Sequence, residues 1–390
     1  MLERISLCPP YRIAIVGGGQ LGKMMTVAAK QLGFHVSILD PTPDSPAGQV
    51  ADSQIVASFL DGAAIRRLAA TADVLTYEFE HIDSEALAIL EEAGFPVFPT
   101  PRLLRVIQHK LAQKQALVAA GIPVPAFMSV GGAADVCAAG QKFGFPLLLK
   151  ACTGGYDGKG NYLLRGPEEI ERGLAALGDV DQMVEEFVPF VCEISVLVAR
   201  GQDGLVRTYP LSENEHQDNI LRQSIIPARV TPLVAARARE VAEAVMREFA
   251  GVGVFCVEMF VTPDGDVLVN EVAPRPHNSG HYSIEACVTS QFEQHIRAIA
   301  GLPLGDTSLH IPVVMVNLLG EDGQEGPAVL EGCRQALALP GVHLHLYGKS
   351  MTAPRRKMGH FTVTAPDLAQ ALSTAAKARQ ALRVVAAKEV

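Results

Sequence analysis

Short apolar segments alternate with amphipathic and polar ones along the first hundred residues, and this alternation is typical of an α/β domain. The segments Arg12–Val16 and His35–Leu39 are predicted strands that are joined by a helix. Two further strands are predicted at Val74–Tyr77 and Pro96–Phe98. We therefore expect a Rossmann-like N-terminal domain at residues 1–110.

The pattern changes after residue 110. An amphipathic helix begins at Lys110 and ends at Gly121, and a small α/β unit follows at about residues 122–188. The segments beyond it are strands at Glu193–Arg200 and Leu205–Pro210, a polar stretch at Ser212–Ser224, a helix at Val234–Phe249, a hairpin at Cys256–Asn270 and the segment Leu344–Tyr347. We expect a central domain at residues 111–305 and a smaller C-terminal domain at residues 306–390.

Composition narrows the class of protein. The chain of 390 residues is 48% apolar with 35 Gly and 25 Pro, as in a loop-rich α/β enzyme of several domains. Its formal net charge of −9 argues against nucleic acid as a partner, because such a partner requires a basic face. No apolar run approaches the ~20 residues of a membrane span, and the 7 Cys without a CxxC pair indicate reduced thiols. These features predict a cytoplasmic enzyme that acts on small molecules.

A glycine-rich segment, Gly154-Gly-Tyr-Asp-Gly-Lys-Gly160, follows the predicted strand Phe145–Lys150. Its four glycines let the backbone approach a ligand closely and point N–H groups at it. Lys150 and Lys159 add positive charge, so the segment is predicted to bind a phosphate chain. It is not a P-loop, because Gly160 stands where GxxxxGK[ST] requires Ser or Thr. The alternative is a surface turn, which accounts for the glycines but not for Lys150.

A second glycine turn, Gly17-Gly-Gly-Gln-Leu-Gly22, joins the first predicted strand to its helix and matches G-x-G-x-x-G. Asp40 follows about 20 residues later, as in NAD-binding Rossmann domains. The motif alone is weak, because the same turn suits any phosphate at a helix N-terminus. An NAD-dependent oxidoreductase is therefore one alternative.

Two carboxylates are predicted to face each other in the hairpin. A turn centred on Asp264-Gly265, a strong two-residue turn signal, places Glu258 opposite Glu271 with Cβ atoms roughly 5 Å apart. Like charges there are destabilising unless a cation offsets them, and Mg²⁺ prefers oxygen ligands of this kind. The pair predicts a magnesium site, to which a one-residue bulge would add Asn270. The alternative is an exposed hairpin with two incidental acids.

Six motifs occur in order along the chain: Gly17–Gly22, Tyr77–Glu80, Gly154–Gly160, Asn214–Arg222, Asn270–His281 and Arg356–His360. Together they resemble the ATP-grasp superfamily and, within it, the N5-carboxyaminoimidazole ribonucleotide synthetases. The resemblance implies an ATP-grasp fold between a Rossmann-like (pre-ATP-grasp) domain and a small C-terminal domain. It also implies a homodimer that uses ATP with magnesium or manganese.

The reaction implied by the resemblance joins bicarbonate to 5-aminoimidazole ribonucleotide (AIR). ATP phosphorylates bicarbonate to carboxyphosphate, and the products are the N5-carboxylated ribonucleotide, ADP and phosphate, in de novo purine biosynthesis. Other ATP-grasp ligases, such as glycinamide ribonucleotide synthetase or a biotin carboxylase-like subunit, are alternatives, as is a nucleotide-binding regulatory module. Those ligases are not expected to combine His277–His281 with Arg356–His360.

The resemblance assigns ATP and metal contacts residue by residue. The ATP phosphates would contact Lys110, Lys150, Gly155, Tyr156, Asp157, Gly158, Lys159, Gly160 and Asn161. The adenine and ribose would contact Glu185, Glu186, Phe187, Val188 and Glu193, with His216 and Asn270 near the nucleotide and Glu258 and Glu271 on the metal. Without the resemblance, Glu185 and Glu186 read as a solvated strand end, and His216 as a structural residue.

The AIR contacts implied by the resemblance come from three parts of the chain. They are Gly19, Gln20, Leu21, Glu78, Tyr156, Asp157, Arg275, His277, Asn278, Lys349 and Arg356. Asp157, Arg275 and Lys349 are the implied catalytic residues. The alternative for Arg355-Arg-Lys357 is a solvated basic turn, with Arg355 facing solvent in either case.

Overall fold

The computed structural model describes residues 8, 9, 11–155 and 160–387. Its N-terminal part is a parallel four-stranded sheet in the order β3-β2-β1-β4. The elements are β1 (Arg12–Val16), α1 (Gln20–Gln31), β2 (His35–Asp40), β3 (Ser53–Val56), α2 (Gly62–Ala69), β4 (Val74–Tyr77) and α3 (Ser84–Glu92). Alternate residues of β1 pack on opposite faces, with Ile13 and Ile15 toward α1 and Ala14 and Val16 toward α2 and α3.

The segment predicted as a strand at Pro96–Phe98 lies parallel to β4, but it forms only a single bridge, between Val97 and Leu75. Leu75 N donates to Pro96 O, and Phe98 N donates to Leu75 O. Pro96 begins the segment and Pro99 follows it, and neither has a backbone N–H with which to lengthen the ladder.

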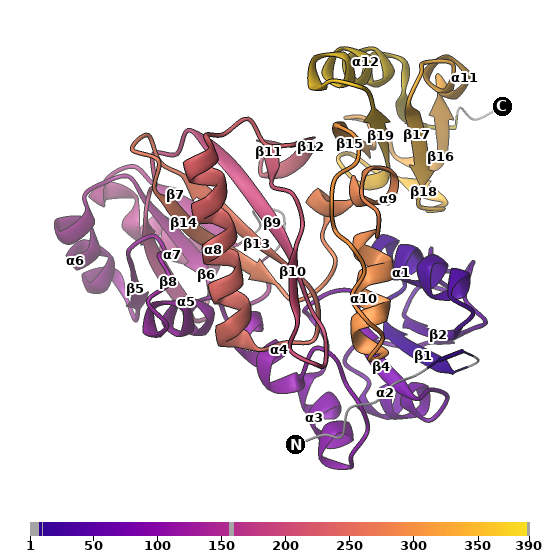
Figure 1. Cartoon of the computed structure of the whole chain (residues 1–390). Helices are drawn as coiled ribbons and strands as arrows, with labels where there is room; N and C mark the ends of the chain where they lie inside the picture. The colour runs from indigo at the N-terminus through magenta and orange to yellow at the C-terminus, as the bar shows by residue number, and fades with distance from the viewer. Residues whose placement is uncertain (1–7, 10, 156–159, 388–390) are drawn as a thin grey trace.

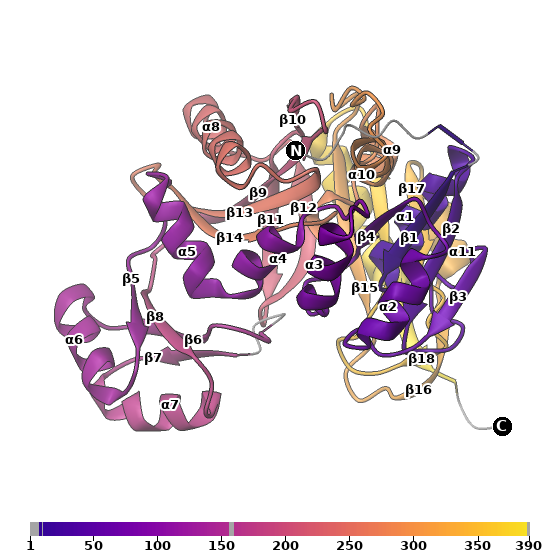
Figure 2. The same ribbon diagram turned by 90° about the horizontal axis from the view of Figure 1, so that it is seen from below.

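The next part of the chain forms an antiparallel four-stranded sheet in the order β5-β8-β6-β7, which stands to one side of the molecule (Figure 2). Two helices, α4 (Pro101–Gln108) and α5 (Lys110–Ala119), lead into it. Its elements are β5 (Phe127–Val130), α6 (Ala133–Phe143), β6 (Leu147–Ala151), β7 (Asn161–Leu164), η1 (Pro167–Glu169), α7 (Ile170–Leu177) and β8 (Gln182–Glu186). The glycine-rich segment connects β6 to β7.

A large antiparallel sheet follows in the order β14-β13-β9-β11-β12-β15-β19-β17, with β10 paired to β9. Its first half comprises β9 (Cys192–Arg200), β10 (Val206–Thr208), β11 (Ser212–Gln217), β12 (Ile220–Ile226), α8 (Pro232–Phe249), β13 (Gly253–Val261), β14 (Val267–Ala273), η2 (Asn278–Gly280), α9 (Ser283–Ala286) and α10 (Gln291–Ile299). Helix α8 packs on Phe255, Val257 and Met259 of β13. Helix α10 packs against α1 and β1, which joins the large sheet to the N-terminal sheet (Figure 1).

The C-terminal residues extend this sheet, because β15 pairs with β12. They form β15 (Val313–Leu319), β16 (Gly326–Glu331), α11 (Cys333–Leu337), β17 (Val342–Leu346), β18 (Met351–Thr352), β19 (Lys357–Thr364), α12 (Leu368–Ala381) and β20 (Arg383–Ala386). Helix α12 packs on β15 and β19. None of the helices in the described part of the chain is long and apolar enough to cross a membrane.

The polar stretch Ser212–Ser224 contains most of an antiparallel hairpin, in which β11 pairs with β12. Asp218 and Asn219 form its turn with φ of 52° and 61°. Asp and Asn tolerate this left-handed conformation better than most side chains do, so the dipeptide was the available turn signal.

Candidate active site

The predicted pair of carboxylates is present on neighbouring strands. Glu258 of β13 and Glu271 of β14 are Cα partners. The loop between the strands is longer than predicted, however: Thr262 N donates to Asp266 O over 2.9 Å, and Met259 pairs with Val269. A bulge that adds Asn270 then restores the predicted pairing, so the register was right although the two-residue turn was wrong.

Both carboxylates are accessible and each has a cationic neighbour. His277 Nε2 lies 2.8 Å from Glu258 Oε1, and Lys110 Nζ lies 3.0 Å from Glu271 Oε2. The charge on Lys110 lowers the pKa of Glu271 to about 2, against the opposing effect of burial. Burial alone would lower the pKa of His277, but Cys256 and Glu258 raise it to about 10. Two opposed carboxylates with an amide beside them are a donor set that fits a hard divalent cation.

A pocket adjoins this pair and is lined by residues of β9, β11, β13 and β14: Glu193, Ile194, Asn214, His216, Glu258, Met259, Phe260 and Asn270. His216 Nδ1 is bonded to the Glu193 carboxylate. Burial lowers the pKa of His216, and the contact with Glu193 more than offsets it, so that the pKa is raised. The pocket thus brings together three residues that were assigned to the nucleotide and one that was assigned to the metal.

Glu185 is enclosed rather than solvated. Its two carboxylate oxygens lie 3.1 Å from Lys114 Nζ and 2.6 Å from Lys150 Nζ, and burial leaves its side chain 3% exposed. Burial raises the pKa of Glu185, but the two lysines outweigh it and the pKa is lowered. Glu186 Oε1 accepts a hydrogen bond from Ala126 N over 2.8 Å. The reading of a solvated strand end is therefore wrong for Glu185.

The residues after Glu186 are connected to the pocket wall through one aromatic contact. Phe187 is exposed and Val188 is buried. Phe190 stacks on Phe260 of the pocket wall, with ring centroids 4.8 Å apart. Phe190, two residues after the segment assigned to the adenine, thus connects the end of that segment to β13.

The glycine-rich loop is described only at its ends, and Tyr156, Asp157, Gly158 and Lys159 lie outside the described residues. Ala151 N donates to Gly160 O over 2.8 Å. Asn161 is the Cα partner of Lys150. Both ends of the loop, Gly155 and Gly160, therefore adjoin the strand that ends in Lys150 and Ala151.

The residues that follow β14 adjoin the carboxylate pair, because His277 contacts Glu258. Arg275 is paired with Glu80, at 2.9 Å from Nε to Oε1. His277 Nδ1 lies 2.9 Å from Ser279 Oγ. The amide nitrogen and oxygen of the Asn278 side chain are buried and have no hydrogen-bond partner among the described residues. Buried polar atoms without a partner require an explanation, and a bound water, ion or ligand is one that a site of this kind can supply.

The first glycine turn is occupied by the chain's own acids. Gly18 N donates to Asp40 Oδ2 over 2.8 Å, and the Glu78 carboxylate accepts from Gly19 N and Gly22 N. Burial raises the pKa of Glu78, although these two hydrogen bonds oppose the shift. In a dinucleotide-binding domain these N–H groups serve the pyrophosphate. The arrangement argues against NAD, and it leaves Gln20 and Leu21 as the first residues of α1.

The C-terminal residues approach this turn from the other side. Lys23 Nζ donates to Tyr347 O over 3.0 Å, and Gln49 Nε2 donates to Gly348 O over 3.0 Å. The next residue, Lys349, donates to Lys357 O over 2.8 Å and lies 5.7 Å from the Tyr347 ring centroid. Segments about 300 residues apart in sequence are therefore neighbours.

The two arginines of the basic turn differ in their contacts. Arg356 donates to Met351 O over 2.8 Å. Arg355 is paired with Asp218 at 3.2 Å and with Asp322 at 3.6 Å, and its side chain is half exposed. Arg355 is therefore an ion-paired surface residue.

Comparisons with known proteins cover the same regions. Residues 11–108 match the ribonucleotide synthetase preATP-grasp domain, residues 115–292 the ATP-grasp domain, and residues 313–374 the phosphoribosylaminoimidazole carboxylase C-terminal domain. The N5-carboxyaminoimidazole ribonucleotide synthase of Bacillus subtilis is 45% identical over 357 residues, which cover 91% of each chain. This chain belongs to the N5-carboxyaminoimidazole ribonucleotide synthase family.

Solved structures of the family agree with the fold. The N5-carboxyaminoimidazole ribonucleotide synthetase from Thermotoga maritima is 48% identical, with a TM-score of 0.89 over 97% of this chain and 100% of that one. The Aspergillus clavatus synthase, crystallised with ADP and AIR, is 34% identical, with a TM-score of 0.89 over 96% of this chain and 99% of that one. As a member of this synthase family, the chain is an ATP-grasp ligase of purine biosynthesis.

Sequence reasoning missed several residues that support the synthase site. Lys114 forms an ion pair with the buried carboxylate of Glu185, and Glu80 forms one with Arg275. Cys256 and Ser279 lie beside His277. One signal was available for Lys114, because it stands four residues after Lys110 on the same helix and hence on the same face. The others depend on contacts between segments distant in sequence.

Proposed function

We propose that this chain carboxylates the amine of AIR, with bicarbonate as the carbon source and ATP as the driving reactant. ATP transfers its γ-phosphoryl group to a bicarbonate oxygen to give carboxyphosphate. The AIR amine then forms a bond to the carboxyl carbon, phosphate leaves, and the amine loses a proton. The observation that carries the proposal is the carboxylate pair Glu258 and Glu271, which lies between the pocket and Arg275–Asn278.

On the nucleotide side, Glu193 would accept hydrogen bonds from the ribose hydroxyls, and its contact with His216 would orient it. The segment Glu185–Val188 would present its backbone to the adenine, and Lys110 and Lys150 would neutralise phosphates. Glu258 and Glu271 would hold magnesium, with Asn270 beside them, and the ion would neutralise charge on the transferred phosphoryl group. Catalysis would otherwise consist mainly of positioning and charge neutralisation by the chain.

On the AIR side, the buried amide of Asn278 and the imidazole of His277 support a polar substrate next to the transferred group. Arg275, held by Glu80, would orient the carboxylate being transferred. Lys349 and Arg356 would bind the ribonucleotide phosphate, and Glu78, together with Gly19–Leu21, would border the ribose. Asp157, which lies outside the described residues, completes the proposed catalytic set with Arg275 and Lys349.

Phosphate release from ATP tests the proposal directly. With bicarbonate and AIR, phosphate should appear in step with the N5-carboxylated product, and omitting AIR should lower the rate strongly. Phosphate release that requires a different amine, or that needs no bicarbonate, would contradict the assigned substrates.

Domain limits, assembly and location are further parts of the proposal. We infer domains at residues 1–110, 111–305 and 306–390, and a cytoplasmic homodimer, on the resemblance described above. Light scattering coupled to size exclusion would test the dimer, since a mass near one 41.5 kDa chain would contradict it.

A further inference from the structure

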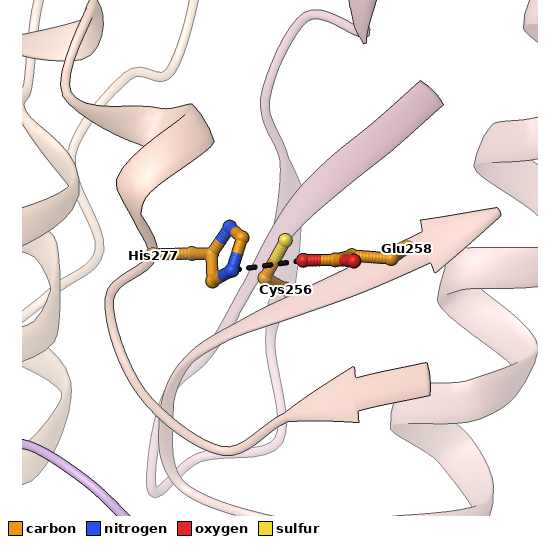
Figure 3. Close-up of side chains that lie close together, drawn as sticks. All are labelled: Cys256, Glu258 and His277. Atoms are coloured by element: carbon orange, nitrogen blue, oxygen red, sulfur yellow. Dashed lines mark ion pairs between the residues drawn. The ribbon is translucent and has the colours of Figure 1, made fainter. Parts of the chain in front are cut away.

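Three side chains of different chemistry meet where the proposed metal and substrate residues adjoin. Cys256 and Glu258 are two residues apart on β13, so their side chains leave the same face of the strand. His277 approaches from the loop after β14 (Figure 3). A sulfur of Cys256, a carboxylate oxygen of Glu258 and a ring nitrogen of His277 all lie within 4.8 Å of one another.

The environment fixes the histidine ring in place. Ser279 Oγ lies 2.9 Å from His277 Nδ1 and 2.7 Å from Ser195 Oγ, and Ser195 Oγ in turn accepts from Asn214 Nδ2 over 2.9 Å. His277 Nε2 is left facing Glu258 Oε1 at 2.8 Å. Ser279 N also donates to His277 Nδ1 over 3.3 Å, so Nδ1 acts as an acceptor in this structure. A ligating histidine donates its second ring N–H, so ligation through Nε2 would require Nδ1 to donate to Ser279 Oγ instead.

Access to the three atoms is one-sided. Cys256 is fully buried, whereas the side chains of Glu258 and His277 are 19% and 16% exposed. Solvent therefore reaches the side chains of Glu258 and His277 but not that of Cys256, and Glu258 also lines the pocket.

Thiolate, imidazole and carboxylate are the donors that zinc takes in proteins, whereas magnesium takes oxygen ligands. We propose that Cys256, Glu258 and His277 form a three-ligand site for a thiophilic divalent cation such as Zn²⁺, with a fourth position open to water or an anion. Binding would replace the His277–Glu258 contact by bonds from both side chains to the cation. The Cys256 thiol and the Nε2–H group of His277 would each release a proton to solvent in this step.

The site would act as an inhibitory one. A zinc ion there would withdraw Glu258 from magnesium and His277 from the substrates, so zinc should inhibit and added magnesium should relieve the inhibition in part. The inhibition rests on the proposed function, because that proposal gives Glu258 and His277 their roles. Zinc binding itself does not rest on it.

Cobalt is the probe for binding, because a Co²⁺–thiolate bond adds a charge-transfer absorption that oxygen and nitrogen ligands do not give. Co²⁺ is titrated into the reduced full-length protein without nucleotide, and Zn²⁺ is then added to displace it. We expect one Co²⁺ per chain with the sulfur band, and loss of that band in Cys256→Ser. The apparent affinity for Zn²⁺ should fall at least about tenfold in this variant. Loss of a residue that only supports a ligand already costs about that much, and loss of the ligand itself should cost more.

The controls are Cys8→Ser and Cys137→Ser, which remove exposed thiols. Both should keep the band. Cys256→Ala and a melting curve of each variant separate loss of the ligand from loss of the fold, because the alanine variant must lose the band while it melts like the wild type. Ser279→Ala should weaken Co²⁺ binding by about 10–100-fold through the freed His277 ring.

The site is overturned if folded Cys256→Ser keeps the sulfur band, or if the band disappears in Cys8→Ser or Cys137→Ser instead. The activity arm follows AIR-dependent phosphate release at several Zn²⁺ concentrations. Wild type should be inhibited, and Cys256→Ser should need at least about tenfold more Zn²⁺. Co²⁺ binding at Cys256 without inhibition would leave the metal site standing and overturn the role proposed for Glu258.

Discussion

Glu185 and Glu271 both face lysines of helix α5, but one pair is enclosed and the other is open. Glu185 contacts Lys114 and Lys150, and the three side chains are 3%, 3% and 9% exposed. Glu271 contacts Lys110, and these two side chains are 44% and 25% exposed. Lys110 and Lys114 are one helical turn apart, so a single helix supplies a cation to each carboxylate.

The difference in exposure suits one carboxylate–lysine contact to a structural role and the other to ligand binding. An enclosed carboxylate cannot change partners without leaving a lysine charge buried and unpaired, which is costly. An open carboxylate can exchange a lysine for a metal ion at small cost, because solvent screens both states. Glu185 is therefore suited to holding the lysines in place, and Glu271 to ligand binding.

The largest effect is expected from Glu185→Gln. The amide leaves two buried ammonium groups without their counter-charge, so the free energy of unfolding should fall by about 3–5 kcal/mol. Urea unfolding followed by circular dichroism measures it. Glu85→Gln, in an exposed pair with Arg105, is the matched control and should change stability by less than about 1 kcal/mol. Equal effects for the two variants would remove the distinction between enclosed and open pairs.

Glu271→Gln should instead reduce turnover. Removing one of two anionic metal ligands should cost about a hundredfold or more, the scale of one lost electrostatic contact in a transition state, while the melting temperature stays near that of the wild type. AIR-dependent phosphate release at limiting magnesium is the assay. Glu243→Gln on α8, a carboxylate of similar exposure at 45%, is the control and should be fully active. Near-normal turnover of Glu271→Gln would refute the metal assignment.

The two pairs also show what the sequence could predict. The prediction that Glu258 lies opposite Glu271 came from counting residues outward from a turn at Asp264-Gly265. In the structure the loop is longer than this turn, and the Asn270 bulge shifts the register back by the same amount. A correct pairing was thus reached by a wrong route. Turn propensity indicates that a hairpin forms, but it does not fix loop length or bulge position.

Burial was harder to predict than strand position. The alternative reading put Glu185 and Glu186 at a strand end, and β8 does end at Glu186. Nothing in the two residues distinguishes the first carboxylate, which is enclosed, from the second, which is not. Enclosure depends on Lys114 and Lys150, which come from α5 and β6. Contacts of this kind, like that of Arg275 with Glu80, join segments far apart in sequence and leave no local pattern.

A third set of cations extends the comparison to the other substrate. Lys349 and Arg356 donate to the backbone carbonyls of Lys357 and Met351. A backbone carbonyl is neutral, so the contact with Met351 does not cancel the charge of Arg356. Lys349→Ala or Arg356→Ala should weaken AIR binding by about 1–3 kcal/mol, as for one lost charge-assisted hydrogen bond.

Calorimetric titration of each ligand separates the two substrates. ATP–magnesium affinity should hardly change in either variant, and Arg355→Ala should behave as wild type because Arg355 is paired with Asp218 and Asp322. If ATP affinity falls while AIR affinity holds, the C-terminal residues face the nucleotide instead.

The smallest expected effect is on how the free energy of unfolding falls at acidic pH. The two lysines lower the pKa of Glu185 below its ordinary value of 4.5, so between the folded and unfolded pKa values only the unfolded chain binds the proton. The stabilisation is therefore complete above pH 4.5 and is lost as the pH falls, with a slope of at most about 1.4 kcal/mol per pH unit. Stability measured from pH 6 to pH 3 should fall less steeply in Glu185→Gln than in the wild type.

Glu271→Gln is the comparison variant in the same acid series. The pKa of Glu271 is lowered to about 2 by Lys110, but the side chain is 44% exposed, and solvent screens its share of the stability. Its acid slope should therefore lie closer to that of the wild type than the slope of Glu185→Gln does. The reverse order would mean that the open pair carries the acid sensitivity, and that exposure does not separate the two carboxylates.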